Sequence, residues 1–449
     1  MKAAEIRESV IYVMKKLLAV FGFAVLMACI PLSGYAQYLR NSYFMEGSSA
    51  RMSLNPALVP SRGYINLPVV GAFGLEVGSN SLGAQDVMDI IDDGGSFCSN
   101  DKFMGMLKDE NTLGLDFSTD VFSVGYHTPK AFVSFGAAVK AQVDAVVPKS
   151  MFQYVYDLEN DLFTGFREYN IRNERLNVNT YTELSFGYAR QVGERLTIGG
   201  KAKMLLGYAN IDLNVKKLDI EAYVLENKVD NVYPYSIIET DAQMALSGKG
   251  IELEYDANGC VDDVKMGKFG IGGYGAAVDF GLEFKVTDHM SLYASVVDLG
   301  FISWSKSASE IFTSTNAVHK YENPEADILD FETFALKGGV KKARKTSLAA
   351  TVTAGGEYGF FNDKLSLGLL SVTSFGEYEK YSELMAIATF RPKSLFNVSA
   401  SYSVLQGTDT FGLALKLGPL MVGTDYMFLS DNTKHVNAYF GLSSPLGRK

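Results

Sequence analysis

The sequence predicts an all-β protein, a transmembrane antiparallel β-barrel of about 14 strands with long extracellular loops. Three observations support this prediction. Apolar and polar residues alternate along most of the chain, and the connections between alternating segments are short and long in turn. After residue 36, no apolar run is long enough for a membrane helix.

Composition excludes several other classes of protein. Of the 449 residues, 47% are hydrophobic and only 20% are charged, which excludes a disordered chain. The mean hydropathy of +0.05 is too low for a polytopic helical membrane protein. Residues 1–36 carry four basic and two acidic residues, so their removal changes the net charge from −10 to −12. An acidic exported chain is a poor ligand for nucleic acid, and we expect no nucleic-acid partner.

Residues 1–36 are predicted to be a cleaved export signal. Lys15 and Lys16 precede an apolar run over residues 17–30, and Gly34 and Ala36 are the small residues expected before cleavage. This compact arrangement also allows Met14 to be the true start. A competing interpretation is a lipobox over residues 26–29 that would acylate its cysteine. Together with the barrel pattern, the signal predicts the outer membrane of a Gram-negative cell.

The predicted strands show a period of two. In residues 278–287, five apolar residues alternate with polar residues or glycine, so the two sets point to opposite faces of a strand. Fourteen such segments lie near residues 64–79, 112–126, 131–147, 178–192, 196–215, 270–287, 290–302, 346–360, 365–375, 381–390, 395–404, 410–417, 420–429 and 434–443.

Loop lengths favour a membrane barrel over a soluble sandwich. Tight turns are predicted at 127–130, 193–195, 288–289, 361–364, 391–394 and 418–419. Long loops are predicted at 80–111, 148–177, 216–269 and 303–345, with short helices near 86–92, 102–108 and 150–166 and a hairpin turn at 256–259. Short turns at one end and long loops at the other are typical of outer-membrane barrels. An even number of strands places both termini on the short-turn, periplasmic side.

Motifs for chemistry are weak. Residues 270–275 match G-x-G-x-x-G, but the alternation that follows indicates the start of a barrel strand rather than a nucleotide site. Residues 256–267 lack the glutamate that closes a calcium loop. The four histidines show no paired spacing for zinc. We therefore predict no catalytic residue, no metal, no cofactor and no enzyme activity.

Two cysteines remain after processing, Cys98 and Cys260. They could form one disulfide in an oxidising compartment, or they could be two unrelated thiols.

Charged residues on the polar face of the strands are predicted to face the lumen. They are Lys140, Lys201, Lys203, Asp279, Glu283, Lys285, Glu357, Lys416 and Asp425. These residues could line a conduction path, or they could pair with one another across a filled interior. Barrels of eight strands fill themselves with side chains and barrels of 16–18 leave a channel, so a 14-stranded barrel should contain something in its lumen.

The segment before the first strand resembles the FadL superfamily. Residues 37–60 include Asn55-Pro56-Ala57 just before the first predicted strand. This superfamily includes fatty-acid channels and the PorV barrel of type IX secretion, and the chain is similar to uncharacterised Bacteroidota barrels related to it. The resemblance implies that residues 37–63 form a hatch inside the lumen, with Asn55, Pro56 and Ala57 as hatch residues, and that residues 64–449 form the barrel.

Two functions remain open. The first is a plugged, FadL-like channel for small hydrophobic or amphipathic molecules. The second is a PorV-like scaffold that binds secreted or surface proteins through its long extracellular loops, since ordered loops of this length usually carry function. The expected partners are outer-membrane lipid and either a hydrophobic small molecule or an exported protein.

Overall fold

The structure is a computed structural model. It describes residues 39–66, 71–83, 85–86, 100–160, 165–224, 235–322, 334–375, 380–393, 395–405, 408–427 and 433–446. The predicted signal peptide and Cys98 lie outside the described residues, as does most of the predicted helix 86–92.

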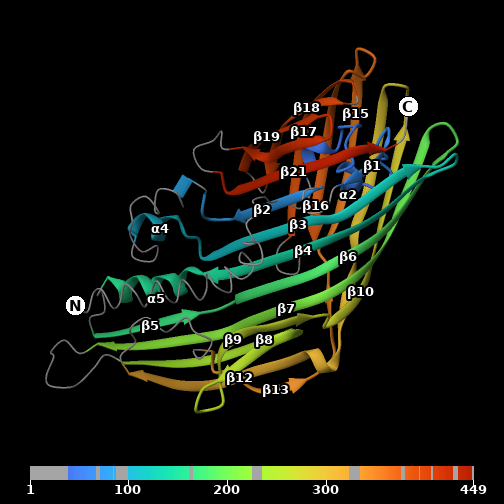
Figure 1. The fold of residues 1–449 in the computed structure, drawn as a ribbon. Helices are drawn as coiled ribbons and strands as arrows, with labels where there is room; N and C mark the ends of the chain where they lie inside the picture. The colour runs from blue at the N-terminus through green and yellow to red at the C-terminus, as the bar shows by residue number, and fades with distance from the viewer. Residues whose placement is uncertain are drawn as a thin grey trace.

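The chain forms a closed antiparallel barrel of 14 strand positions, as predicted (Figure 1). Two positions are each shared by two short strands. In ring order the strands are β1 (Gly63–Asn66) with β2 (Phe73–Ser79), β3 (Glu110–His127), β4 (Phe132–Pro148), β6 (Glu174–Val192), β7 (Leu196–Val224), β10 (Gly273–Lys285), β11 (Met290–Trp304), β14 (Arg344–Ser347) with β15 (Ala350–Phe360), β16 (Leu365–Phe375), β17 (Lys380–Lys393), β18 (Phe396–Leu405), β19 (Thr408–Leu417), β20 (Leu420–Met427) and β21 (His435–Leu446).

The ring closes through the broken first strand. β1 pairs with both β21 and β3, and β2 pairs with the same two strands further along. Closure leaves no open sheet edge within the ring, which is required where lipid offers no hydrogen-bond partner.

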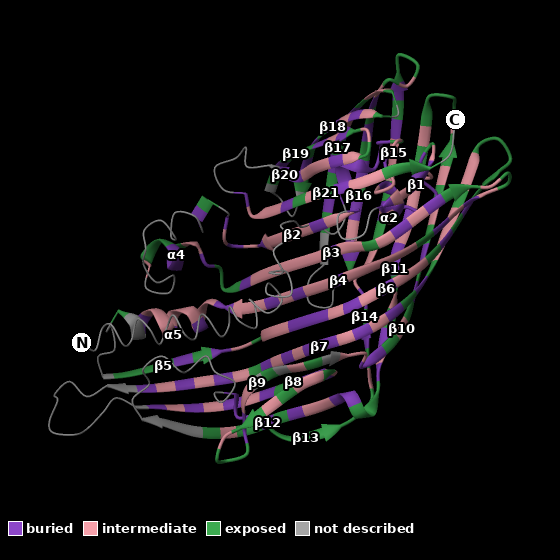
Figure 2. Cartoon of the chain, in the orientation of Figure 1, coloured by how far each residue is buried: buried purple, intermediate pink, exposed green. Residues whose placement is uncertain are grey.

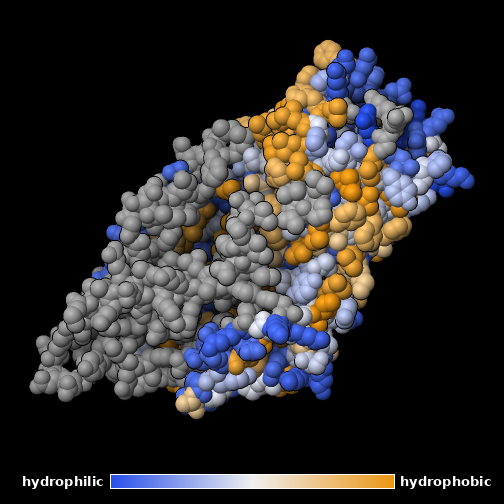
Figure 3. Space-filling view, viewed as in Figure 1, coloured by the Kyte–Doolittle hydropathy of each residue, from blue (hydrophilic) through white to orange (hydrophobic). Residues whose placement is uncertain are grey.

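The wall has two unlike faces. Along β10, Tyr274, Val278, Phe280 and Leu282 are exposed, whereas Ala277 and Asp279 between them are buried. Figure 2 shows the same alternation as bands of different burial along the strands. Figure 3 shows a hydrophobic band on the outer surface, with hydrophilic residues beyond it at the end with the tight turns. The outward face therefore suits lipid.

The predicted tight turns are confirmed. Gly193 and Gly418 adopt φ values of 68° and 59°, and residues 361–363 are also left-handed, which reverses the chain within a few residues. The glycine-rich residues 270–275 lead into β10 as predicted, and residues 256–259 form the turn of a hairpin.

The two long connections predicted at 216–269 and 303–345 do lie between strands of the ring, but most of their length is strand rather than irregular loop. β7 continues to Val224 and pairs with β8 (Tyr235–Tyr255), which pairs in turn with β12 (Ser309–Glu322) and β9 (Val261–Gly270). β13 (Lys337–Lys341) pairs with β12, and β5 (Gly165–Ile171) pairs with β7. We call this sheet beyond the ring the extension. Alternation of apolar and polar residues indicates that a strand has two unlike faces. It does not indicate whether lipid or protein covers the apolar face.

The helices of the described residues are few and short. α4 (Asp101–Met106) agrees with the helix predicted at 102–108, and Asn100 caps it. α5 (Lys149–Glu159) is shorter than the predicted helix 150–166, because Phe166 belongs to β5. Among the described residues, no helix is long and apolar enough to cross a membrane.

The lipid-facing position of Phe280 leads to a first prediction. Phe280 lies midway along the apolar face of β10 and its side chain is 59% exposed. Phe280→Arg should destabilise the folded barrel in lipid vesicles by about 2–4 kcal/mol, because arginine is costly near the bilayer midplane. Unfolding by guanidinium in vesicles measures this change.

Val318→Arg is the matched control. Val318 is 64% exposed on β12 of the extension, outside the ring. This substitution should leave the unfolding midpoint unchanged. An equal loss of stability in both variants would contradict the assignment of the lipid-facing band.

Candidate functional site

Residues 39–60 run through the interior of the barrel. They form a 3-10 helix, η1 (Arg40–Ser42), and one short turn of α-helix, α2 (Arg51–Leu54). Their polar contacts reach β2, β10, β17 and β20. A segment can touch strands all around a closed ring only from within it. In Figure 1 this segment is the blue chain around α2.

Arg40 binds one end of the segment to the wall. Its guanidinium lies 3.2 Å from a carboxylate oxygen of Glu76 and 3.3 Å from one of Glu383. The backbone N–H groups of Arg40 and Asn41 donate to the two oxygens of Asp425, each over 2.8 Å. Asp425 thus satisfies two backbone donors that would otherwise be buried without a partner.

Asn55 binds the other end. Its Oδ1 accepts a hydrogen bond from the Ala57 N–H (2.9 Å), and its Nδ2 donates to Tyr43 Oη (3.0 Å) and the Leu282 carbonyl (3.2 Å). Pro56 has no N–H to satisfy, so the chain turns here without leaving an orphan donor. The structure therefore brings Asn55, Pro56 and Ala57 together inside the barrel, against β10 and β11.

Glycines on the inner wall make room for this segment. A Cβ at Gly199 or Gly281 would collide with residues 55–57, and one at Gly368 with Phe44. A Cβ at Gly412 would collide with Asn41, and one at Gly423 would crowd Leu39. These five positions lie on five different strands, so the wall is shaped to the segment around much of the ring.

Apolar contacts complete the fit. Four side chains of the segment pack in one buried cluster with five from β11, β16 and β17; they are Tyr43, Phe44, Leu54, Leu58, Tyr293, Leu370, Val372, Met385 and Ile387. Arg391 donates to the Phe44 carbonyl over 2.7 Å and lies 3.0 Å from Glu357. The segment is thus held by polar and apolar contacts together.

Beside the segment lies a buried group of charges that we call the ionic cluster. It consists of Lys140, Glu183, Lys203, Asp279 and Asp298. Lys203 Nζ lies 2.6 Å from Asp298 and 2.8 Å from Asp279, and Lys140 Nζ lies 3.0 Å from Glu183. Three carboxylates and two ammonium groups nearly neutralise one another, as burial away from water requires.

The other predicted lumen charges have separate environments. Glu357 accepts from Tyr293 Oη (2.6 Å) and Arg391, and Lys416 Nζ donates to the Gly418 carbonyl over 2.7 Å. Lys201 and Glu283 are half-buried. Lys285 is exposed beside the turn at the end of β10, so the structure does not bring it to the ionic cluster.

Sequence reasoning missed several charges of the lumen. Glu183 lies on the polar parity of a correctly predicted strand, so alternation could have found it. Asp298 lies at a bulge between β10 and β11 with φ of 60°, where the alternation is broken. Arg40 carries no periodic signal, because its segment is not a strand.

A cavity remains between the segment and the wall strands β1, β3, β4 and β6. Its polar lining includes Ser53, Asn66, Asp120, Ser123 and Lys201. Its apolar lining includes Leu39, Met52, Tyr64 and Tyr439. The cavity thus offers hydrogen-bonding groups and apolar surface side by side.

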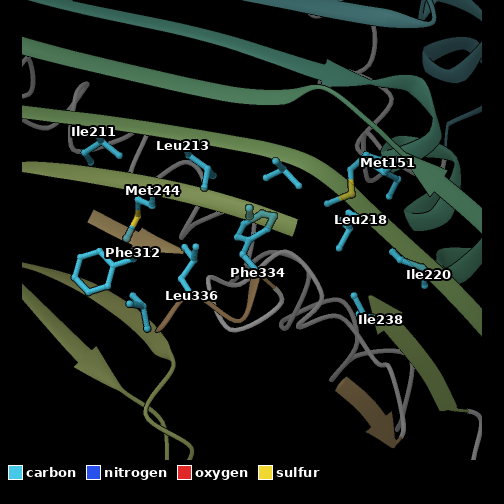
Figure 4. Close-up of a cluster of buried hydrophobic side chains, with 14 of the residues drawn as sticks. Met151, Ile211, Leu213, Leu218, Ile220, Ile238, Met244, Phe312, Phe334 and Leu336 are labelled. Carbon is cyan, nitrogen blue, oxygen red and sulfur yellow. The ribbon is translucent and has the colours of Figure 1, made fainter. Parts of the chain in front are cut away.

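A large apolar core supports the extension on its outer face (Figure 4). Val143 belongs to this core and has the same parity on β4 as the outward-facing Phe135. Met151 and Tyr154 of α5, with Phe334 and Leu336, cover that face. Where the wall extends beyond the apolar band, its outer face is therefore covered by protein and not by lipid.

In the described part of the chain, no group of three or more His, Cys, Asp or Glu residues could hold a metal ion. Cys260 is buried in the extension.

The profile of a protein family of unknown function, DUF5723, matches residues 56–425. This chain belongs to that family. No curated protein matches the chain.

Several solved barrels are similar to this chain. The TodX deltaS2S3 mutant monoaromatic hydrocarbon channel has 11% identity over 89% of this chain and 95% of its own, with a TM-score of 0.44. The Ralstonia pickettii toluene transporter TbuX has 11% identity over 93% and 100%, with a TM-score of 0.42. A Pseudomonas aeruginosa FadL homologue has 11% identity over 92% and 99%, with a TM-score of 0.32. The expected relations to PorV and to Bacteroidota barrels stay predictions.

The close fit at Gly199 leads to a second prediction. Gly199→Ala should loosen residues 39–60, because the added methyl group meets the backbone of Pro56 and Ala57. Overpacking of this kind costs about 1–3 kcal/mol. Hydrogen exchange of residues 39–60 in the folded barrel should become at least several-fold faster.

Gly200→Ala is the control, since its Cβ would point to the other face, 3.5 Å from the nearest atom, the Asp279 carbonyl oxygen. Exchange in this variant should match the wild type. Unchanged exchange in Gly199→Ala would show that the wall does not constrain the segment.

The ionic cluster leads to a third prediction. Lys203→Met should destabilise the barrel by about 3–5 kcal/mol, because it leaves Asp279 and Asp298 buried with less compensating charge. Urea unfolding in detergent or vesicles measures the change. Lys285→Met removes an equal charge from an exposed site and should leave stability unchanged. Similar stability in both variants would contradict the role of the cluster.

Proposed function

We propose that this outer-membrane-type barrel is a channel for small amphipathic molecules. In this proposal residues 37–63 act as a hatch, residues 64–449 form the conduit, and both termini lie on the periplasmic side. The cavity between residues 39–60 and the wall carries the proposal, because it lies inside the ring and touches the segment that fills the ring.

The contacts of the segment support a movable hatch. Arg40 and Asn55 hold it through ion pairs and hydrogen bonds, and such contacts can be exchanged for water or ligand. The inner glycines let the segment lie close to the wall without a covalent link to it. Displacement towards the end with the tight turns would open a path beside the ionic cluster.

The lining favours an amphipathic substrate over a purely hydrophobic one. The inner side chains of Lys140, Lys203 and Asp279 are charged and buried, so an oily molecule would meet polar groups that it could not satisfy. The cavity pairs Asn66, Asp120 and Ser123 with Met52 and Tyr64. A molecule with one polar end and one apolar end could satisfy both sets.

A scaffold for an exported protein is the second candidate. One observation favours it: all five residues of β13 are exposed, and β13 pairs with β12 as its only partner among the described strands. An exposed edge can accept an added strand from a partner. This candidate predicts a stoichiometric protein partner that is lost when β13 is removed, with no effect on conduction.

The channel proposal leads to a fourth prediction. Full-length protein in planar bilayers should conduct little, and a variant lacking residues 39–58 should show stable open steps, because the lumen loses its filling. Gly199→Ala should show intermittent openings, and Gly200→Ala should behave as the wild type. Single-channel recording measures these currents.

Folding of each variant is checked first by heat-dependent migration in SDS gels. A shortened variant that folds but conducts no more than the full chain would overturn the channel proposal. In vesicles, uptake of a short-chain amphiphile should exceed uptake of a neutral sugar of similar size. Equal uptake of both would contradict the amphipathic preference.

A further inference from the structure

A group of lysines lies where the barrel wall meets the extension. We call it the lysine corner: Lys306, Lys341, Lys342 and Lys345. All four are exposed, and none forms an ion pair with a described residue. The corner joins the end of β11, the 3-10 helix η2 (Lys306–Ala308), and the turn from β13 to β14.

Strand pairing brings these residues together. Lys345 on β14 stands opposite Ser303 on β11, three residues before η2 begins the path to β12. Lys341 stands opposite Glu310, and the Lys342 N–H donates to the Ser309 carbonyl over 3.1 Å. Two stretches of chain, at residue 306 and at residues 341–345, thus bring lysines to one corner.

Lys345 lies on the outer, lipid-facing side of the wall. Phe301 is an exposed member of the apolar face of β11, and Ser303 has the same parity. Lys345 therefore also points outward, and its Nζ lies 4.7 Å from the centre of the Phe301 ring. Figure 3 shows hydrophilic residues over β12 and β13 beside the hydrophobic band.

Charge balance at the corner is one-sided. Residues 301–310 and 337–347 contain six basic residues and one acidic residue, Glu310. One of the six, Arg344, turns inward and lies 2.9 Å from Asp212. Lys345 points outward and the other three lysines of the corner are exposed, in a chain whose net charge is −10.

We propose that the lysine corner binds the phosphate groups of a phosphorylated glycolipid in the bilayer leaflet at the extension end of the barrel. Acyl chains of the lipid lie along Phe301 and Leu299, both exposed, while its phosphates contact the lysines directly above. A basic cluster immediately beyond an apolar span is suited to anionic headgroups. In the orientation proposed above, this is the outer leaflet.

Protection of an exposed sheet edge is another use for lysine, and β13 is such an edge. That role would account for Lys341 alone, because Lys306, Lys342 and Lys345 lie outside β13. The triple variant Lys306→Gln, Lys342→Gln and Lys345→Gln therefore separates the two roles. The matched control is Lys130→Gln, Lys364→Gln and Lys393→Gln, three exposed lysines at the tight-turn end.

Native mass spectrometry of the full chain in detergent tests the proposal, with lipid A and its dephosphorylated form as probes. The wild type should bind phosphorylated lipid A and the control triple should match it. The corner triple should bind roughly a hundredfold more weakly at low salt, since each lysine near an anionic surface contributes about a fivefold factor. Added salt should reduce binding to the wild type.

Equal affinity in the corner triple and the wild type would overturn the proposal, as would equal loss in the control triple. Equal binding of dephosphorylated lipid A would show that acyl contacts alone suffice. Displacement of the lipid by inorganic phosphate at millimolar concentration would show a free-anion site instead. Aggregation of Lys341→Gln, with lipid binding unchanged in the corner triple, would leave edge protection as the role of these lysines and would overturn the proposal. Conduction does not enter this test, so it can fail while the channel proposal stands.

Discussion

Closure of backbone hydrogen bonding is the constraint on which the rest of this structure depends. Lipid offers no partner to a strand edge, so the ring has to close. Here it closes through the two short strands β1 and β2, each paired with both β21 and β3. A closed ring fixes one face of every strand towards lipid and the other towards a confined interior. Charges such as Lys203 and Asp279 are then forced together, because little water is left to solvate them.

The confined interior also explains the N-terminal segment. Its irregular backbone cannot satisfy itself, so the wall supplies the partners: Asp425 accepts from two N–H groups, and Ser295 donates to the Leu54 carbonyl. The wall glycines are the converse adaptation. Gly199 and Gly281 carry no side chain, and this allows the segment to approach the sheet closely. The segment and the wall are therefore complementary in polarity as well as in shape.

Much of this fold could be predicted from the sequence, for a physical reason. Alternation and turn residues are local, and residues 278–287 or Gly193 carry them whatever the distant chain does. The extension was missed because β8 does not alternate cleanly: apolar residues are adjacent at 237–238 and at 244–246. The bulge at β7 also shifts the parity, since Tyr181 pairs with Gly207 but Thr180 pairs with Ala209. Apolar residues therefore pass from even numbers before Tyr208 to odd numbers after it, while remaining on one face.

The lumen was less predictable, because its contacts join residues far apart in the chain. Arg40 and Asp425 are 385 positions apart, and no local pattern links them. Parity places Lys203 and Lys285 on the inner face of their strands, but they lie at different depths along the barrel. Lys203 belongs to the ionic cluster, whereas Lys285 is exposed at the rim. Depth in a barrel depends on how neighbouring strands are staggered, and only the complete ring sets that stagger. A pattern within one strand can therefore indicate that a charge faces inward, but the ring decides whether that charge has a partner.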